Sequence, residues 1–280
     1  MTRSASPLRY PGGKAKLLNF MQSVVIANNL YGHVYREPFA GGGGLALSLL
    51  YSGFCSRISL NDADPAIAAF WRSVTRQPKD FCSKIAGVEL SLDEWRRQKE
   101  IWSNKGASDF DLGFATFYLN RTNRSGIIEG AGPIGGYGQK GNYSIDARFN
   151  RLGLIKSVSQ IGKSADRIEV TECDAVDYLH RHCDERSFVY LDPPYYVKGQ
   201  RLYRNYYIHE DHLKVARCVK SLNCPWIVSY DNVEEIREIY NWGRSIEFTL
   251  QYSAAKSVRG EEVIFLGPNL DMDGVLSLAA

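Results

Sequence analysis

The residues of this chain best suited to chemistry form the run Asp192–Tyr195, in which a carboxylate precedes two prolines and an aromatic ring. The apolar residues 188–191 before it are typical of a short buried strand. That strand must end at the prolines, because proline donates no backbone hydrogen bond and has a fixed φ. The turn presents a carboxylate, a prolyl carbonyl and a tyrosine ring to one small volume. This set suits a planar ring that carries an amino group; the alternative is a proline-rich strand exit with a buried tyrosine.

A second candidate site is the glycine-rich stretch 38–44, which follows an expected strand and precedes a helical pattern. Strand, glycine loop and helix in this order are typical of a Rossmann-like nucleotide site. The stretch lacks the GxGxxG spacing of dinucleotide enzymes and the GxxxxGK[ST] spacing of phosphate loops. We therefore expect it to bind a single adenosine with a short charged tail rather than a pyrophosphate or a triphosphate.

Two acidic residues follow the next expected strands. Asp62 lies 21 residues after Gly41, where an acid accepts hydrogen bonds from ribose hydroxyls. Capping of the next helix is the alternative for Asp62, but Asp64 suits that role better because Pro65 follows it. Asp174 follows the third strand, where it either meets the amino group of an adenine or caps the helix after it.

The first residues supply a further cation. Pro11, Gly12 and Gly13 form a loop that lets the backbone approach a ligand closely, and Lys14 follows it. Lys14 could bind a carboxylate or a phosphate there. A solvated lysine near a helix N-terminus is the alternative.

Strands and helices in alternation must position these residues, which predicts an α/β fold. Residues 77–165 interrupt the alternation with helical patterns at 81–102 and 112–121. We therefore expect one domain from residues 1–76 and 166–280, with residues 77–165 inserted. The expected strands are 33–37, 57–61, 167–171, 188–191, 225–230, 245–250 and 262–266. The other helical patterns are 17–25, 45–50, 65–71 and 175–182, and a further helix is expected after Asn232.

The insertion contains a long glycine-rich loop, residues 122–142, which carries cationic, amide and aromatic side chains. Loops of this length inside a compact chain are usually functional or disordered. Arginine and asparagine are side chains that read guanine and adenine edges, so DNA contact is one interpretation. A surface loop without function is the other. The candidate DNA-binding residues at and before this loop are Asn120, Arg121, Asn123, Arg124, Tyr137 and Lys140.

The composition is that of an ordinary globular protein, with 44% hydrophobic and 23% charged residues. A net charge of +3 is a weak indication of a polyanionic partner. The six cysteines include no CxxC pair, so we expect reduced thiols and no metal site. No run approaches the roughly 18 apolar residues that span a bilayer. The N-terminus also lacks a signal-peptide pattern, so we expect a cytoplasmic protein without membrane association.

Together these motifs resemble the Dam-type DNA N6-adenine methyltransferases, the alpha group or D12 class. In that family the cofactor motifs precede the recognition insertion and the catalytic motif follows it. The resemblance extends over nearly the whole chain without a break in order. The matching pieces are Leu8–Lys14, Glu37–Gly44, Leu60–Asp62, Leu119–Arg121, Asp174, Asp192–Tyr195, Ser229–Asp231 and Arg259–Phe265.

The resemblance implies a Rossmann-like class I methyltransferase fold with a largely helical, inserted target-recognition domain. It implies S-adenosylmethionine as the cofactor and S-adenosylhomocysteine as its product. It assigns catalysis to Asp192, Pro193, Pro194 and Tyr195. The implied cofactor-binding residues are Tyr10, Lys14, Glu37, Pro38, Phe39, Ala40, Gly41, Gly42, Gly43, Asp62, Asp174 and Asp192.

Double-stranded DNA is the implied partner, and methyl transfer to the N6 of a flipped-out adenine is the implied activity. N4-cytosine transfer and a catalytically silent DNA-binding relative are the alternatives. The chain departs from the family at Tyr10-Pro11, in the four consecutive glycines after Ala40 and in the loop before Gly141, so a GATC target does not follow. We expect a monomer from a prokaryote or a phage. A restriction system with a cognate endonuclease and a solitary regulator both stay open.

Overall fold

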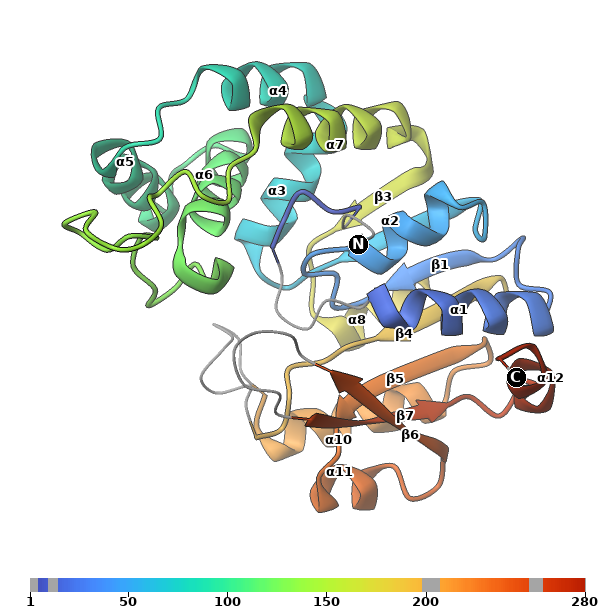
Figure 1. Ribbon diagram of the computed structural model, residues 1–280. Helices are drawn as coiled ribbons and strands as arrows, with labels where there is room; N and C mark the ends of the chain where they lie inside the picture. Colours follow the sequence, from blue (N-terminus) through green and yellow to red (C-terminus); the bar gives the residue numbers. More distant parts are fainter. Residues whose placement is uncertain (1–4, 10–14, 198–206, 252–258, 280) are drawn as a thin grey trace. The chain divides into compact units, whose positions relative to one another are not determined.

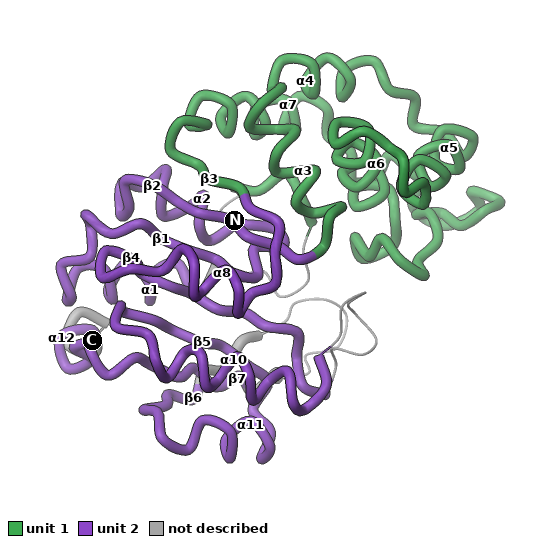
Figure 2. The backbone as a smooth tube through the Cα atoms, turned by 180° about the vertical axis from the view of Figure 1, so that it is seen from behind, with its two compact units in different colours: residues 1–11, 64–170 green, residues 12–63, 171–280 purple. Residues whose placement is uncertain are grey.

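A computed structural model of the 280-residue chain describes residues 5–9, 15–197, 207–251 and 259–279 (Figure 1). The chain forms two compact units (Figure 2). The sheet unit comprises residues 12–63 and 171–280, and the helical unit comprises residues 1–11 and 64–170. These units do not coincide with the predicted domains, residues 1–76 with 166–280 and residues 77–165. Residues 1–11 and helix α3 (Pro65–Arg76) group with the helical unit. The functional division of the two parts stays a prediction.

A seven-stranded sheet has the order β3-β2-β1-β4-β5-β7-β6. Neighbours among β2, β1, β4 and β5 are parallel, whereas β7 is antiparallel to both β5 and β6. This mostly parallel sheet with its helices confirms the predicted Rossmann-like α/β fold. The strands are β1 (Val34–Glu37), β2 (Arg57–Asn61), β3 (Ile168–Thr171), β4 (Ser187–Leu191), β5 (Trp226–Asp231), β6 (Arg244–Gln251) and β7 (Arg259–Leu266).

Helices of the sheet unit cover the strands because a parallel sheet must bury both faces. Helices α8, α10 and α11 share one apolar core with β4, β5 and β7. Away from this core, α1 packs beside α2 and α12 (Figure 1). Their bounds are α1 (Ala15–Ala27), α2 (Gly44–Tyr51), α8 (Ala175–His182), α10 (His209–Lys220), α11 (Glu234–Ile239) and α12 (Met272–Ala279).

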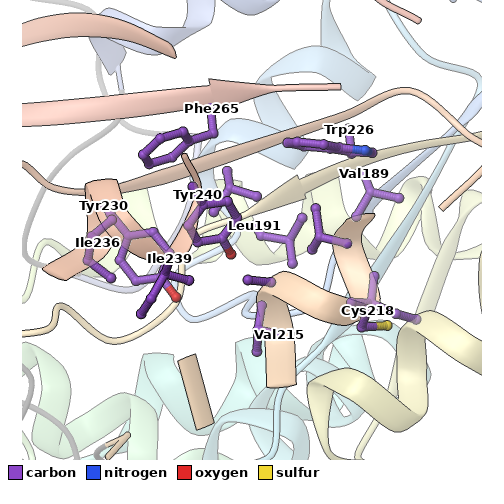
Figure 3. Close-up of a cluster of buried hydrophobic side chains, with 14 of the residues drawn as sticks. Val189, Leu191, Val215, Cys218, Trp226, Tyr230, Ile236, Ile239, Tyr240 and Phe265 are labelled. Atoms are coloured by element: carbon purple, nitrogen blue, oxygen red, sulfur yellow. The ribbon is translucent and has the colours of Figure 1, made fainter. Parts of the chain in front are cut away.

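The shared core includes side chains from the end of β4 (Figure 3). Leu191, the last residue of β4, is fully buried among side chains that include Val215 of α10 and Tyr230 of β5. Burying an aliphatic or aromatic side chain contributes about 1.5–3 kcal/mol relative to leaving it exposed. The residue after Leu191 therefore leaves the sheet from a firmly held position.

The helical unit has its own aromatic core. The Phe81 ring centroid lies 5.4 Å from those of both Phe114 and Phe117, and Phe70 stacks on Phe117 at 6.2 Å. Besides α3, the elements are α4 (Pro78–Gly87), α5 (Leu92–Ser103), α6 (Asp109–Thr122), η1 (Arg124–Gly126), α7 (Arg151–Lys163) and η2 (Ala165–Arg167).

The single helix predicted for residues 81–102 was wrong, because two helices occupy that stretch. The first ends at Gly87, and the second starts after Ser91, whose hydroxyl accepts a hydrogen bond from the Glu94 amide at 3.2 Å. A serine cap fixes a new helix start, which the continuous apolar spacing concealed. The predicted cap at Asp64 is confirmed, since its side chain accepts from the Ala66 amide at 2.9 Å.

Candidate active site

The turn after β4 places Asp192 at the carboxyl end of a central strand, half-buried, with Pro193 and Pro194 buried behind it. Ser229 of β5 donates a hydrogen bond to Asp192 Oδ1 at 3.0 Å. The Ser229 hydroxyl also lies 2.8 Å from the Tyr190 hydroxyl. Because Ser229 has one proton and gives it to the carboxylate, Tyr190 is the donor in this second bond.

Two acids on neighbouring strands hold the residues after the prolines. The Tyr195 hydroxyl donates to Oε1 of Glu262, a buried residue of β7. The Asp231 carboxylate, at the end of β5, accepts from the backbone amides of Tyr196 at 2.9 Å and Val197 at 3.1 Å. Hydrogen bonds to an ionised carboxylate are about twice as strong as neutral ones. Residues 192–197, called the catalytic turn below because they carry the predicted catalytic motif, are therefore fixed by side chains from two adjacent strands.

The glycine loop after β1 turns sharply around the end of β2. Gly41 and Gly43 have φ values of 45° and 54°, which glycine adopts without a Cβ clash. The Gly41 amide donates to Asp62 Oδ2 at 2.8 Å, and the Ala40 amide donates to the Asn61 carbonyl at 2.8 Å. Asp62 thus lies beside the loop, as a ribose-binding acid after this strand would.

Glu37, the last residue of β1, has a structural position. Its side chain is buried, and Oε1 accepts from the Tyr35 hydroxyl at 3.1 Å and from the Ala46 amide at 3.2 Å. It therefore ties the first turn of α2 to β1. Pro38 and Ala40 are buried beside it, whereas Phe39 is half-buried.

Asn61 is a residue that the sequence analysis missed. It is fully buried, and its amide nitrogen donates to the carbonyls of Pro38 and Cys173, each at 3.0 Å. Its amide oxygen accepts from the Thr171 hydroxyl at 2.9 Å and from the Cys173 backbone amide at 3.2 Å. One side chain thus joins the ends of three strands. An amide immediately before an expected ligand-binding acid was the available signal.

Asp174 caps α8, which was one of its two predicted roles. Its Oδ1 accepts from the Val176 amide at 2.8 Å and from the Asp177 amide at 3.4 Å. The capping bonds end on one carboxylate oxygen, so they leave the adenine-binding role of the other oxygen as a prediction. Tyr10 and Lys14 lie outside the described residues.

The candidate DNA-binding residues differ sharply in exposure. Asn120 is buried and exchanges two 2.7 Å hydrogen bonds with the Arg9 backbone. Asn123 is also buried, accepting from the Trp95 indole at 2.7 Å and donating to the Ile127 carbonyl at 2.8 Å. These two amides hold the loop. The exposed candidates are Arg124, Tyr137 and Lys140, whereas Arg121 is half-buried.

Arg121 belongs to a cluster of three arginines in the helical unit. Arg121 Nη2 donates to the Arg148 carbonyl, and Arg9 Nη1 donates to the Asn123 carbonyl at 3.0 Å. Burial, with Arg9 and Arg148 nearby, lowers the pKa of Arg121 to about 10. Burial and Arg148 likewise lower the pKa of Arg9. No described carboxylate forms an ion pair with these three side chains, so their charge is available to an anion.

Two further features concern metals and membranes. Within the described ranges, no group of three or more His, Cys, Asp or Glu side chains is arranged to hold a metal ion. None of the described helices combines the length and the apolar character needed to cross a bilayer.

Comparison with known families accounts for this arrangement. The model of the D12 class N6 adenine-specific DNA methyltransferases matches residues 10–254, and the chain belongs to that family. The match includes the glycine loop, the turn after β4 and the helices between them. It confirms the family and the enzyme class that the motif order predicted.

Individual relatives are methyltransferases of restriction–modification type by name. The chain is 26% identical to the Type II methyltransferase M.MjaIII of Methanocaldococcus jannaschii, across 67% of this chain and 68% of the relative. It is 23% identical to the Type II methyltransferase M1.LlaDCHI of Lactococcus lactis subsp. cremoris, across 90% and 91%. The Modification methylase StsI of Streptococcus sanguinis is 24% identical across 69% of this chain, but only 29% of StsI is matched.

Proposed function

We propose that this DNA methyltransferase transfers a methyl group from S-adenosylmethionine to the exocyclic N6 of an adenine flipped out of double-stranded DNA, within a specific sequence. The observation that supports this proposal most directly is the fixed orientation of the Asp192 carboxylate. Ser229 fixes its carboxylate at 3.0 Å, at the end of β4 and one residue before a rigid Pro-Pro turn. A fixed acceptor at this place suits an amino group presented in one orientation.

The amino nitrogen of adenine is a poor nucleophile, because its lone pair is conjugated with the ring. Asp192 and the Pro193 carbonyl accept its two hydrogens, which localises the lone pair on nitrogen. With S-adenosylmethionine bound, this nitrogen would receive the methyl group in place of sulfur and would release one N6 proton. Positioning and fixed dipoles are sufficient for such a transfer. The Tyr195 ring, anchored through Glu262, stacks on the adenine.

The residues around the glycine loop fit the cofactor. S-adenosylmethionine supplies a methyl group on a sulfonium, which is a good leaving group. Asp62 accepts from the ribose hydroxyls, and Gly41 and Gly43 let the backbone approach it closely. Phe39 offers an apolar face to the adenosine, and Asp174 accepts from its amino group. Lys14, by its match to the family, binds the charged tail.

We assign cofactor binding and catalysis to the sheet unit and target recognition to the helical unit. The arginine cluster Arg9, Arg121 and Arg148 has no described anionic partner and suits a DNA phosphate. Arg124 and Tyr137 are exposed and suit base or sugar contact. Flipping the target base costs a few kcal/mol, which stacking on an aromatic ring offsets by about 1–3 kcal/mol.

The test is single-turnover transfer of labelled methyl to DNA by wild type and by Asp192→Asn and Asp192→Ala. Both variants should bind duplex normally and, at saturating S-adenosylmethionine, should lose transfer by about 10²–10³. Asparagine should be no better than alanine, because its NH2 group opposes the N–H of the substrate. Asp273→Asn, at an exposed acid of α12, is the matched control and should keep full activity.

Sequencing of the product for modified bases gives the base and its context together. Near-normal transfer by Asp192→Asn would refute the catalytic assignment, and methylated cytosine in place of adenine would refute the target base. These two results are independent of each other.

A further inference from the structure

Tyr207, two residues before α10, packs against a side chain of the proposed cofactor site. Its ring meets the Phe39 ring edge to face, with centroids 5.8 Å apart and an interplanar angle of 73°. Phe39 opens the glycine loop that follows β1. Both rings are only half-buried, although both pack against the core of the sheet unit. The two rings therefore form an apolar corner with surface left uncovered.

His212 also packs against Tyr207. The two rings meet edge to face at 5.5 Å, and His212 is fully buried. Its Nδ1 lies 3.0 Å from the Tyr230 hydroxyl of β5, and its ring lies 5.2 Å from that of Tyr196. Tyr196 belongs to the catalytic turn and is bound through its amide to Asp231. Tyr207 therefore packs on a histidine that is bonded to β5, and β5 also holds the catalytic turn through Asp231.

The phenol of Tyr207 lies in an acidic environment. Burial, followed by the negative charges of Asp174, Asp211 and Asp62, raises its pKa, so the hydroxyl stays protonated at neutral pH and is a donor. Two of these acids, Asp62 and Asp174, are the residues proposed to bind the ribose and the adenine. Among the described residues, the hydroxyl has no hydrogen-bond partner. A donor beside both acids and without a protein acceptor is placed to serve a ligand.

We propose that Tyr207 is a cofactor-binding residue. With Phe39 it forms the apolar corner on which the adenosine of S-adenosylmethionine packs, and its hydroxyl donates a hydrogen bond to that adenosine. His212 acts as a positioning residue for its ring. This assignment rests on the proposed function, since it presumes an adenosine cofactor. The glycine loop, Asp62 and Asp174 follow β1, β2 and β3. Tyr207 adds a residue from the connection between β4 and β5, and β5 lies on the other side of β4 in the sheet order.

Calorimetric binding of S-adenosylhomocysteine to the full chain tests the assignment. Tyr207→Ala should weaken binding about 10- to 100-fold, the scale of a lost stacking contact. Tyr207→Phe keeps the ring, and loss of one hydrogen bond should weaken binding about 3- to 10-fold. Tyr31→Ala is the control and should leave affinity unchanged, because Tyr31 is an exposed aromatic of the same unit that stacks on Phe54.

Steady-state methylation supplies a second readout. The KM for S-adenosylmethionine should rise in both Tyr207 variants while kcat at saturation is kept, because Tyr207 does not touch the reacting atoms. Affinity within twofold of wild type in either folded variant, or a lower kcat with an unchanged KM, would overturn the assignment. If wild type itself fails to bind the cofactor, the proposed function is overturned as well. If the alanine variant does not fold, Tyr207→Phe decides.

Discussion

Single side chains near the end of β4 determine how Asp192, the proposed catalytic carboxylate, is held. A buried chain of hydrogen bonds runs from the Tyr190 hydroxyl through Ser229 to Asp192 Oδ1. Ser229 is 1% exposed, so water does not replace a lost partner easily. The serine thus bonds the Asp192 carboxylate directly, whereas the tyrosine bonds the serine.

This difference gives a prediction at the residue scale. Ser229→Ala should lower single-turnover methyl transfer about 10-fold or more, because one charge-assisted hydrogen bond to Asp192 is lost. Tyr190→Phe is the matched control and should keep most of the activity, since the Ser229–Asp192 bond survives. Equal losses in the two variants would show that the whole buried chain, and not the serine alone, positions the carboxylate.

Sequence reasoning at this scale recognised side chains by their chemistry but could not see their partners. Asp192 and Tyr195 were recognised because the two prolines between them restrict the backbone to few conformations. Asn61 and Glu262 did not stand out, since a buried polar residue within a strand is recognised only by the distant groups that it bonds. The buried position of Asn120 was invisible for the same reason, because its partner Arg9 lies 111 residues away.

At the scale of elements, the catalytic turn is a feature of three strands rather than one. β4 carries it, β5 holds it through Asp231, and β7 holds it through Glu262. Asp231 and Glu262 face each other in the antiparallel register of β5 and β7. A shift in that register would move one anchor away from the other and release the turn.

We predict that Asp231→Asn slows methyl transfer about 10-fold while cofactor and DNA affinities stay near wild type. An asparagine has one acceptor oxygen, so it can no longer serve both the Tyr196 and Val197 amides. Asn232→Ala changes the next residue, which bonds Arg237 instead, and should leave kcat unchanged. A rise in KM without a fall in kcat would contradict this positioning role.

Element order was readable from the sequence, but element ends and several helices were not. Every expected strand is present because β-branched and aromatic runs stood between clear turn residues. Helices α7, α10 and α12 were not predicted. The polar start of α10, with two histidines and two acids, lacks the regular apolar spacing that indicates a helix. Its buried face is recognised only in contact with β4 and β5.

At the scale of the whole molecule, one buried histidine that takes no part in the proposed methyl transfer makes folding stability depend on pH. His212 is fully buried among aromatic rings, and burial lowers its pKa to about 4. The charges of Asp231 and Asp211 oppose this effect, and His209 adds to it. In the unfolded chain the pKa is about 6.5, so the unfolded state binds more protons between these two values.

Stability should therefore fall as pH decreases from about 6.5 towards about 4, by up to roughly 3 kcal/mol from this residue. Urea denaturation at pH 7 and pH 5 measures the difference. His212→Gln cannot titrate, so it should lose less stability over that interval than wild type does. Parallel losses in both proteins would place the acid sensitivity at other groups.

The anchors of the catalytic turn have a consequence for how the enzyme is made. Tyr195 is bonded to a residue 67 positions later in the chain. At about 5–20 residues per second, a ribosome needs roughly 3–13 seconds to make that stretch. During this interval the nascent chain carries the complete Asp-Pro-Pro-Tyr motif without the side chain that anchors its tyrosine. A chain that ends prematurely before β7 would likewise contain the whole motif but would lack Glu262, the residue that anchors Tyr195.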